Sequence, residues 1–222
     1  MKVLHIANWY PNRENDREAL FIKRQIETLE EHVEDQVIIH LQVKTGRFKI
    51  QSYHAFGAKH VVWQIPTSRW FIIELISTML LFLVLLRQKA NRYDILNFHI
   101  AYPNLTYWHY LKKVFRTHAI ITEHWSAYHF HFNVDRALPR IQRIFKQDIP
   151  LIAVSQSLAT DVKIFSQSEF PIYIVPNVVK PNFEIDTSVV RNQGQFFMVA
   201  QWKYPKQPLI VIDAFKRLVD TH

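Results

Sequence analysis

The stretch Ile120-Ile-Thr-Glu-His-Trp-Ser-Ala-Tyr128 joins the end of a predicted strand to a polar and aromatic segment. Ile120 and Ile121 are β-branched and apolar, which is typical of a buried strand. In an open parallel sheet, ligands bind beyond the carboxyl ends of the strands. His124 falls in that position and can exchange a proton near neutral pH. The stretch therefore predicts a parallel α/β sheet with a functional histidine at its edge.

A second histidine follows another predicted strand in the same way. His99 ends the run Asp94-Ile-Leu-Asn-Phe-His99. Two histidines at equivalent strand ends predict a cleft more strongly than either does alone.

Predicted strands alternate with predicted helices along most of the chain. The strands are expected at 2–8, 37–43, 61–65, 94–98, 118–122, 151–154, 172–175 and 196–200, and the helices at 19–29, 70–86, 103–115, 136–147, from 155 onward and at 208–219. Residues 44–60 are polar and are expected to be irregular. This alternation predicts an α/β fold, a Rossmann-like parallel sheet with helices on both faces.

The pattern also predicts two domains. Residues 1–180 form the first, the polar stretch 181–194 is a linker, and 195–222 begin a second domain. One strand and one helix cannot bury their own apolar faces. We therefore expect the second domain to be cut short soon after it starts.

Composition narrows the functions that the chain can have. The 222 residues carry a net charge of +8 and only three glycines, with no cysteine. The charge predicts an anionic partner or a generally basic surface. The scarcity of glycine excludes a glycine-rich phosphate loop, and the absence of G-x-G-x-x-G after the first strand disfavours a dinucleotide dehydrogenase. The absence of cysteine, and an N-terminus without a signal-peptide pattern, favour the cytoplasm.

The most apolar segment, 70–86, has two interpretations. Its roughly 17 residues only reach the lower limit for a bilayer span, and Glu74 lies within it. A buried crossover helix is favoured. The alternative is a helix on the inner membrane surface, with Arg69, Arg87 and Lys89 at its ends.

The predicted helix at 136–147 is basic. Its cations Arg136, Arg140, Arg143 and Lys146 are interleaved with apolar residues. Docking on an anionic membrane and an ordinary solvated face are equally compatible with this pattern.

The ordered segments resemble the retaining glycosyltransferases of family 4, whose B-type fold has two facing Rossmann-like domains. The resemblance rests on motifs spread over nearly the whole chain: Ile6-Ala-Asn-Trp-Tyr-Pro11, Asp94 to His99 with Tyr102-Pro103, Ile121-Thr-Glu-His124, Ile152-Ala-Val-Ser-Gln-Ser157 and Ile174-Val-Pro-Asn-Val178. Departures include Ala19 near a position where the family often has glycine. The family's paired glutamates would lie beyond His222.

The resemblance implies roles for particular residues. His124 would be the catalytic residue facing the donor sugar. The donor would be bound by Lys206, Ser155 and Asn177, and the acceptor by His99, Trp9 and Tyr10. Ser155 also reads as a helix cap. The donor would be a nucleotide-diphosphate sugar, the acceptor a glycan or lipid-linked glycan of a surface polysaccharide, and neither a cofactor nor a metal would be needed.

Other functions remain as alternatives. The same fold would suit a sugar-nucleotide epimerase or a phosphorylase, and the charge would suit a membrane-surface binding module without activity. Nucleic acid is not expected, because no recognition motif accompanies the charge. A metal site at His124, His129 and His131 is not expected either, because their spacing matches no familiar zinc pattern.

Overall fold

The computed structural model describes residues 1–130, 138–179, 188, 190, 194–200, 202 and 206–221. The chain divides into two compact units, Met1–Val179 and Lys180–His222, and each is described by itself. Apart from residues 188, 190 and 194, the predicted linker at 181–194 lies outside the described residues.

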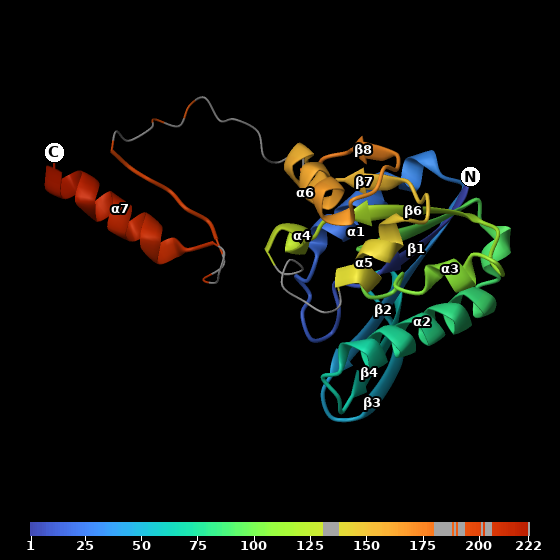
Figure 1. The fold of residues 1–222 in the computed structure, drawn as a ribbon. Coiled ribbons are helices and arrows are strands. Elements are labelled where there is room, and N and C mark those ends of the chain that lie inside the picture. Colours follow the sequence, from blue (N-terminus) through green and yellow to red (C-terminus); the bar gives the residue numbers. More distant parts are fainter. Residues whose placement is uncertain are drawn as a thin grey trace. The chain divides into compact units, whose positions relative to one another are not determined.

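The described part of the first unit contains one eight-stranded sheet with the order β3-β4-β2-β1-β5-β6-β7-β8 (Figure 1). The strands are β1 (Lys2–Ala7), β2 (Asp35–Thr45), β3 (Lys49–Ala55), β4 (Ala58–Ile65), β5 (Ile95–His99), β6 (His118–Glu123), β7 (Leu151–Ala153) and β8 (Ile172–Ile174). All these pairings are parallel except that of β3 with β4. The predicted α/β class is thus confirmed, with an antiparallel edge strand added.

Helices cover both faces of this sheet. They are α1 (Leu20–Thr28), α2 (Trp70–Arg87), α3 (Trp108–Leu111), α4 (Ala127–Phe130), α5 (Leu138–Phe145) and α6 (Gln156–Ser166), with short 3₁₀ turns at Glu30–His32 and Ala90–Arg92. The chain moves in one direction from β1 to β2 and in the opposite direction from β4 to β8. Right-handed crossovers therefore place α1 on one face, and α2, α3, α5 and α6 on the other.

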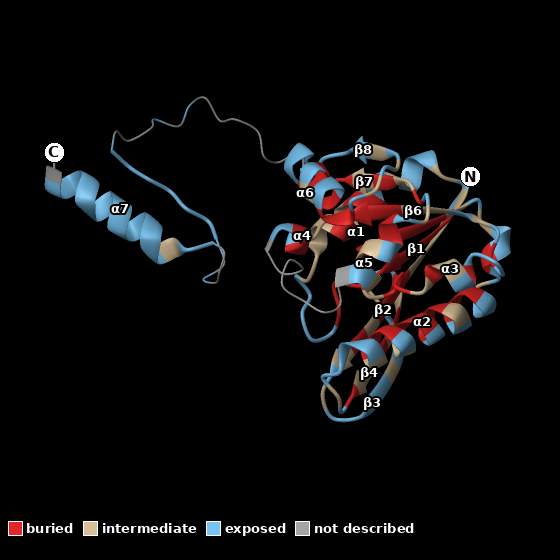
Figure 2. Ribbon diagram, in the orientation of Figure 1, coloured by how far each residue is buried: buried red, intermediate tan, exposed pale blue. Residues whose placement is uncertain are grey.

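The two faces hold separate hydrophobic cores. The large core contains Leu4, Leu81, Phe98 and Ile144 among many others, and lies between the sheet and the helices of the second face. The small core lies beneath α1 and consists of Ala7, Tyr10, Ile22, Ile26, Ala58 and Ile100. Figure 2 shows these buried positions in red along the sheet and on the inner sides of the helices.

Helix α2 is a crossover helix with one buried and one exposed side. It is the one helix among the described residues that is long and apolar enough to cross a membrane by length and composition. Its inner side includes the buried Leu81 and Leu85, and also Glu74. The Glu74 carboxylate accepts hydrogen bonds from Arg140 of α5 at 2.9 Å and from the Tyr102 hydroxyl at 3.0 Å. Arg140 therefore faces inward, whereas Arg143 is exposed and Arg136 lies outside the described residues.

The expectation of an irregular segment at 44–60 was wrong. Strand β3 pairs with β4 through a two-residue turn at Phe56 and Gly57, with φ values of 52° and 77°. Positive φ at both positions is the pattern of a type I′ hairpin turn. The sequence hides this strand because β3 lies at the sheet edge, where several of its side chains meet solvent and no apolar alternation is needed.

Two further expectations need correction. In the range 103–115, only Trp108–Leu111 is α-helical. The Thr106 hydroxyl donates to the Pro103 carbonyl at 2.8 Å, a local bond that competes with helix formation. In the second unit, residues 196–200 are not in a strand, because they have no ladder partner among the described residues. Helix α7 (Pro208–Thr221) follows them close to its predicted bounds.

Candidate functional site

The carboxyl ends of β1 and β5 form the topological switch point of the sheet. The connections leave these neighbouring strands in opposite directions, so a crevice opens at their ends. Asn8, the residue after β1, spans this gap. Its amide nitrogen donates to the carbonyl oxygens of Ile100 and Tyr102, at 2.8 Å each. Asn104 donates a hydrogen bond to the Asn8 side-chain oxygen. The ends of the two strands are thus fixed together by side-chain amides.

A cavity of about 270 Å³ lies at this switch point. Its walls come from the ends of β1, β2, β5 and β6 and from the start of α2. They consist of Asn8, Trp9, Gln42, Val43, Lys44, Thr45, Trp70, Ile73, Tyr102, Pro103 and Trp125. The rings of Trp9 and Trp125 meet edge-on at 5.3 Å, and those of Trp70 and Tyr102 lie 6.2 Å apart. Aromatic faces with amide and hydroxyl groups beside them suit the apolar faces and hydroxyls of a sugar.

Buried Glu123 holds the loops that surround the cavity. One carboxylate oxygen accepts from the backbone nitrogens of His124 and Trp125, at 3.0 and 2.9 Å. The other accepts from the Ala101 nitrogen at 3.1 Å and from the Tyr128 hydroxyl at 2.6 Å. Burial raises the pKa of Glu123, and these four donors oppose that rise. The side chain ties the loop after β6 to the loop after β5.

A row of histidines lies on the α1 face of the sheet. His5 Nδ1 and His99 Nε2 are 3.1 Å apart, within hydrogen-bonding distance. The His99 and His124 rings stack with centroids 5.8 Å apart. Burial lowers the pKa of His5 to about 4 and lowers the pKa of His99 well below its ordinary value. At neutral pH this row is therefore uncharged.

His124 stands at the end of the row that is closest to solvent. It is half-buried, and burial lowers its pKa to about 4, while the nearby Asn177 side chain opposes this shift. Neither ring nitrogen of His124 has a hydrogen-bond partner among the described residues. The structure thus brings together two residues predicted to meet the donor, His124 and Asn177. A neutral imidazole has one donor and one acceptor nitrogen, and both nitrogens of His124 are buried in this structure.

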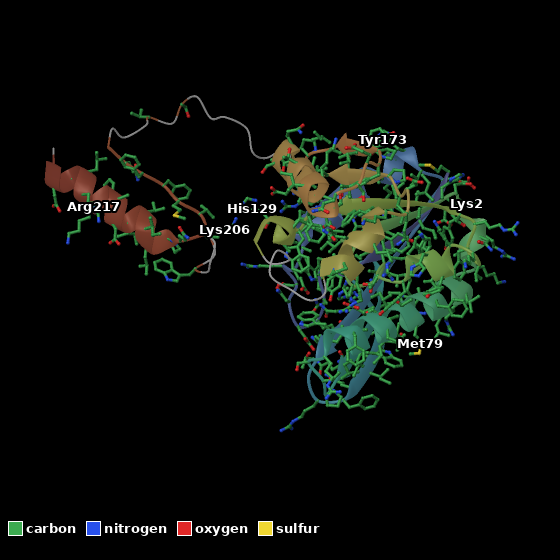
Figure 3. The ribbon with its side chains drawn as sticks, in the orientation of Figure 1. Lys2, Met79, His129, Tyr173, Lys206 and Arg217 are labelled. Carbon is green, nitrogen blue, oxygen red and sulfur yellow. The ribbon has the colours of Figure 1, made fainter. Side chains whose placement is uncertain are left out.

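The other predicted site residues are dispersed. Trp9 lines the cavity, but Tyr10 is buried in the small core and its hydroxyl donates to the Phe56 carbonyl at 3.4 Å. His99 is 1% exposed and lies within the histidine row. The Ser155 hydroxyl accepts from the Leu158 nitrogen at 3.2 Å and caps α6. Lys206 is exposed and belongs to the second unit (Figure 3).

The backbone beside the cavity carries strain. Ile100, directly after β5, has φ of 71°, a left-handed conformation that β-branched residues rarely adopt. Asn8 holds the Ile100 carbonyl, and the Ile100 nitrogen donates to the Thr122 carbonyl at 3.0 Å. Strained residues persist where their surroundings fix them, and they gather at functional sites.

No group of three or more potential metal ligands occurs among the described residues. His129 lies 3.1 Å from Asp161, and His131 lies outside the described part of the chain.

Sequence reasoning missed several residues of this site. Trp70, Trp125 and Glu123 received no role, although Trp125 and Glu123 adjoin His124 in the sequence. An aromatic residue directly after a parallel strand was the usable signal in the case of Trp125. Trp70 gave no such signal, because the start of α2 meets the strand ends only through the fold.

Comparisons with known proteins agree with this architecture. No protein-family model matches the sequence, and no curated protein matches it. Among solved structures, it is similar to the trehalose-6-phosphate synthase OtsA, with 13% identity and a TM-score of 0.54 over 82% of this chain and 50% of that one. A structure described as trehalose-6-phosphate from E. coli bound with UDP-2-fluoro glucose gives 11% identity, a TM-score of 0.55 and the same coverages. The apo form of the lipopolysaccharide outer core galactosyltransferase WaaB has 17% sequence identity and a TM-score of 0.53. The match covers 81% of this chain and 46% of that one.

These similarities establish the class of fold. The first unit has a Rossmann-like α/β fold, which is similar to parts of the solved structures of OtsA and WaaB. This chain spans about half the length of the solved structures that it matches.

Proposed function

We propose that this chain belongs to a retaining glycosyltransferase of family 4. The enzyme would move a hexosyl group from a nucleotide-diphosphate sugar to a glycan or lipid-linked acceptor. The observation that carries this proposal is the aromatic cavity at the switch point of the sheet, whose wall includes Trp125, the residue after His124, with Asn177 beside His124. WaaB, a named galactosyltransferase of the lipopolysaccharide outer core, supports a role in surface polysaccharide synthesis. The lack of cysteine supports a cytoplasmic location.

In this proposal the cavity takes the acceptor. Indole faces of Trp9 and Trp125 would stack on sugar rings, while Asn8 and Gln42 would bond hydroxyls. His124 would hydrogen-bond the donor sugar as a neutral imidazole, because its pKa of about 4 keeps it uncharged at neutral pH. Asn177 would meet the diphosphate side of the donor, where negative charge grows as the glycosidic bond breaks.

The test is sugar transfer by the full-length protein. The protein is incubated with a panel of nucleotide-diphosphate sugars and with glycan or lipid-linked acceptors. The products are identified by mass spectrometry. We expect Trp125→Ala to raise the acceptor KM roughly tenfold while kcat changes little. We expect His124→Asn to lower kcat roughly a hundredfold. Tyr173→Ala, an exposed aromatic on β8 (Figure 3), is the matched control and leaves both constants unchanged.

Two results would count against the proposal in different ways. Absence of transfer with every donor would remove the transferase function altogether. Transfer with inversion, measured from the anomeric proton coupling in the product, would remove the family 4 assignment alone.

A further inference from the structure

The outer side of α2 is an extended apolar surface. Six of its large hydrophobic side chains are between 44% and 61% exposed: Trp70, Phe71, Leu75, Met79, Leu83 and Leu86. We refer to these six residues as the α2 surface. Figure 2 shows this outer side in pale blue, and Figure 3 shows Met79 projecting away from the sheet. A soluble helix normally presents polar residues on this side, so the surface needs an apolar partner.

The surface continues onto the neighbouring α3 region. Phe82 of α2 meets Phe115 with ring centroids 5.8 Å apart, which joins the two segments. Beside this contact, Tyr110 is 61% and Val114 is 50% exposed. The apolar area therefore covers more than one helix.

Cations border this apolar area. Arg69 precedes α2, Arg87 and Lys89 stand at its other end, and Lys112, Lys113 and Arg116 follow α3; all are exposed. Residues 66–117 include only two carboxylates. Glu74 is buried and forms an ion pair with Arg140. The Asp94 carboxylate accepts a hydrogen bond from the backbone nitrogen of Lys2 at 2.6 Å. Positive charge around the apolar area is thus left without a local counter-charge on α2.

A groove of about 330 Å³ lies between α2 and β4 at the same end as Arg87. Lys59 and Arg87 line it together with apolar residues that include Trp63 and Leu83. Neither cation forms an ion pair with a described residue. Two unpaired cations over apolar walls match the phosphate and the upper acyl chain of a phospholipid.

We propose that the α2 surface docks on a membrane that contains anionic phospholipids. The apolar side chains would enter the headgroup region, and the bordering cations would face lipid phosphates. The helix would lie on the bilayer and not cross it, because its inner side is committed to the sheet and holds the Glu74–Arg140 pair. A second copy of the chain fits poorly, because a twofold contact would bring equal cation clusters together. This proposal does not depend on the proposed function.

Vesicle co-sedimentation of the full chain, without any nucleotide sugar, tests the docking. Vesicles of phosphatidylcholine alone are compared with vesicles that also contain phosphatidylglycerol. We expect binding to the mixed vesicles that weakens as salt rises. The double variant Leu75→Gln/Leu83→Gln should lower the vesicle affinity at least roughly tenfold. Arg87→Glu and Lys113→Glu should each lower it by roughly fivefold or more.

Matched controls keep the result specific. Ile164→Gln alters an apolar residue that is 71% exposed on α6, and Arg17→Glu alters an exposed cation before α1; both should bind like the unaltered protein. Circular dichroism and thermal melting of each variant confirm folding. Failure of the unaltered protein to bind the mixed vesicles would overturn the proposal, as would undiminished binding by the double variant. A dimer in light scattering that Leu75→Gln/Leu83→Gln separates would assign the surface to a second copy and also overturn it.

Discussion

The two faces of the sheet are both buried, but they are buried with different chemistry. On the face covered by α2, α3, α5 and α6, side chains such as Leu96, Phe98 and Ile121 pack in the large apolar core. On the α1 face, residues of the same strands are polar: Asn97 and His99 of β5 and Thr122 of β6 are all buried. Apolar burial stabilises at any pH, whereas buried histidines stabilise only while they remain neutral. The face of the large core thus provides stability that does not depend on pH, whereas the α1 face holds the row of histidines that ends at His124.

The largest effect should come from the apolar face. Phe98 is 1% exposed and packs edge-on against Trp108 at 5.1 Å. We expect Phe98→Ala to lower the free energy of unfolding by about 4 kcal/mol, through lost burial and an unfilled cavity. Urea denaturation at neutral pH measures this change. Phe48→Ala, at a residue that is 67% exposed, is the control and should remain within about 0.5 kcal/mol. A comparable loss of unfolding free energy in both variants would contradict the predicted difference between the buried and the exposed phenylalanine.

Acid should unfold the protein through the α1 face. Burial lowers the pKa of His5 to about 4 and that of His40 to about 3, so the unfolded chain takes up protons first as the pH falls below 6.5. Stability should therefore be constant near pH 7 and decline below pH 6.5, down to about pH 4 through His5 and about pH 3 through His40. The full loss through His5 is about 3 kcal/mol. Urea denaturation at several pH values measures the slope.

Substitutions of single histidines identify the groups that cause this decline in stability with falling pH. His5→Asn should flatten the decline, whereas His32→Asn, at an exposed histidine, should leave it unchanged. A slope that is the same in all three proteins would show that the buried histidines do not control acid stability.

The buried carboxylate of Glu123 should stabilise the loops at the carboxyl ends of β5 and β6. In Glu123→Gln, an NH₂ group replaces one of the acceptor oxygens. This NH₂ group then faces N–H or O–H donors and cannot accept their hydrogen bonds. We expect the free energy of unfolding to fall by about 2 kcal/mol. Tyr128→Phe removes only the 2.6 Å hydroxyl donor and should cost about 1 kcal/mol. Thermal and urea denaturation compare the two, and an unchanged Glu123→Gln protein would refute the role of the carboxylate as a clamp.

The smallest effect concerns the start of α1. Ala19 has φ of 47° and ψ of 42°, the left-handed region that glycine occupies without strain. We expect Ala19→Gly to raise the free energy of unfolding by about 1 kcal/mol. Ala153→Gly in β7 is the converse control and should lower it by a similar amount. A destabilised Ala19→Gly protein would show that the left-handed conformation is not maintained in solution.

The helix–strand alternation was readable from sequence because it depends on local patterns. Runs such as Val37-Ile-Ile39 carry apolar residues at both faces of a parallel strand, and only a sheet covered on both sides accommodates them. The site at the strand ends followed from the same reasoning, since carboxyl ends of parallel strands share one edge. The edge strand β3 escaped prediction because exposed side chains leave no such pattern.

Pairings between distant residues were beyond sequence reasoning. Glu74 and Arg140 are 66 positions apart, and His5 and His99 are 94 apart. In the sequence, Glu74 only interrupted an apolar helix, and Arg140 was one cation among four. Their contact exists because α2 and α5 cover the same face of the sheet and these two side chains reach each other there.

By itself, the sequence determined the class of fold, the order of most strands and helices, and the edge at which His124 stands. The spacing of apolar residues along the chain indicates which side chains are buried on folding, and this is enough to predict a parallel sheet. Only the tertiary structure decided that Trp70 joins Trp9 and Trp125 around one cavity, that Tyr10 is buried away from it, and which side of α2 remains exposed. The physical reason is that these properties depend on side-chain directions and on neighbours from distant segments. Those are fixed only when the whole sheet has packed.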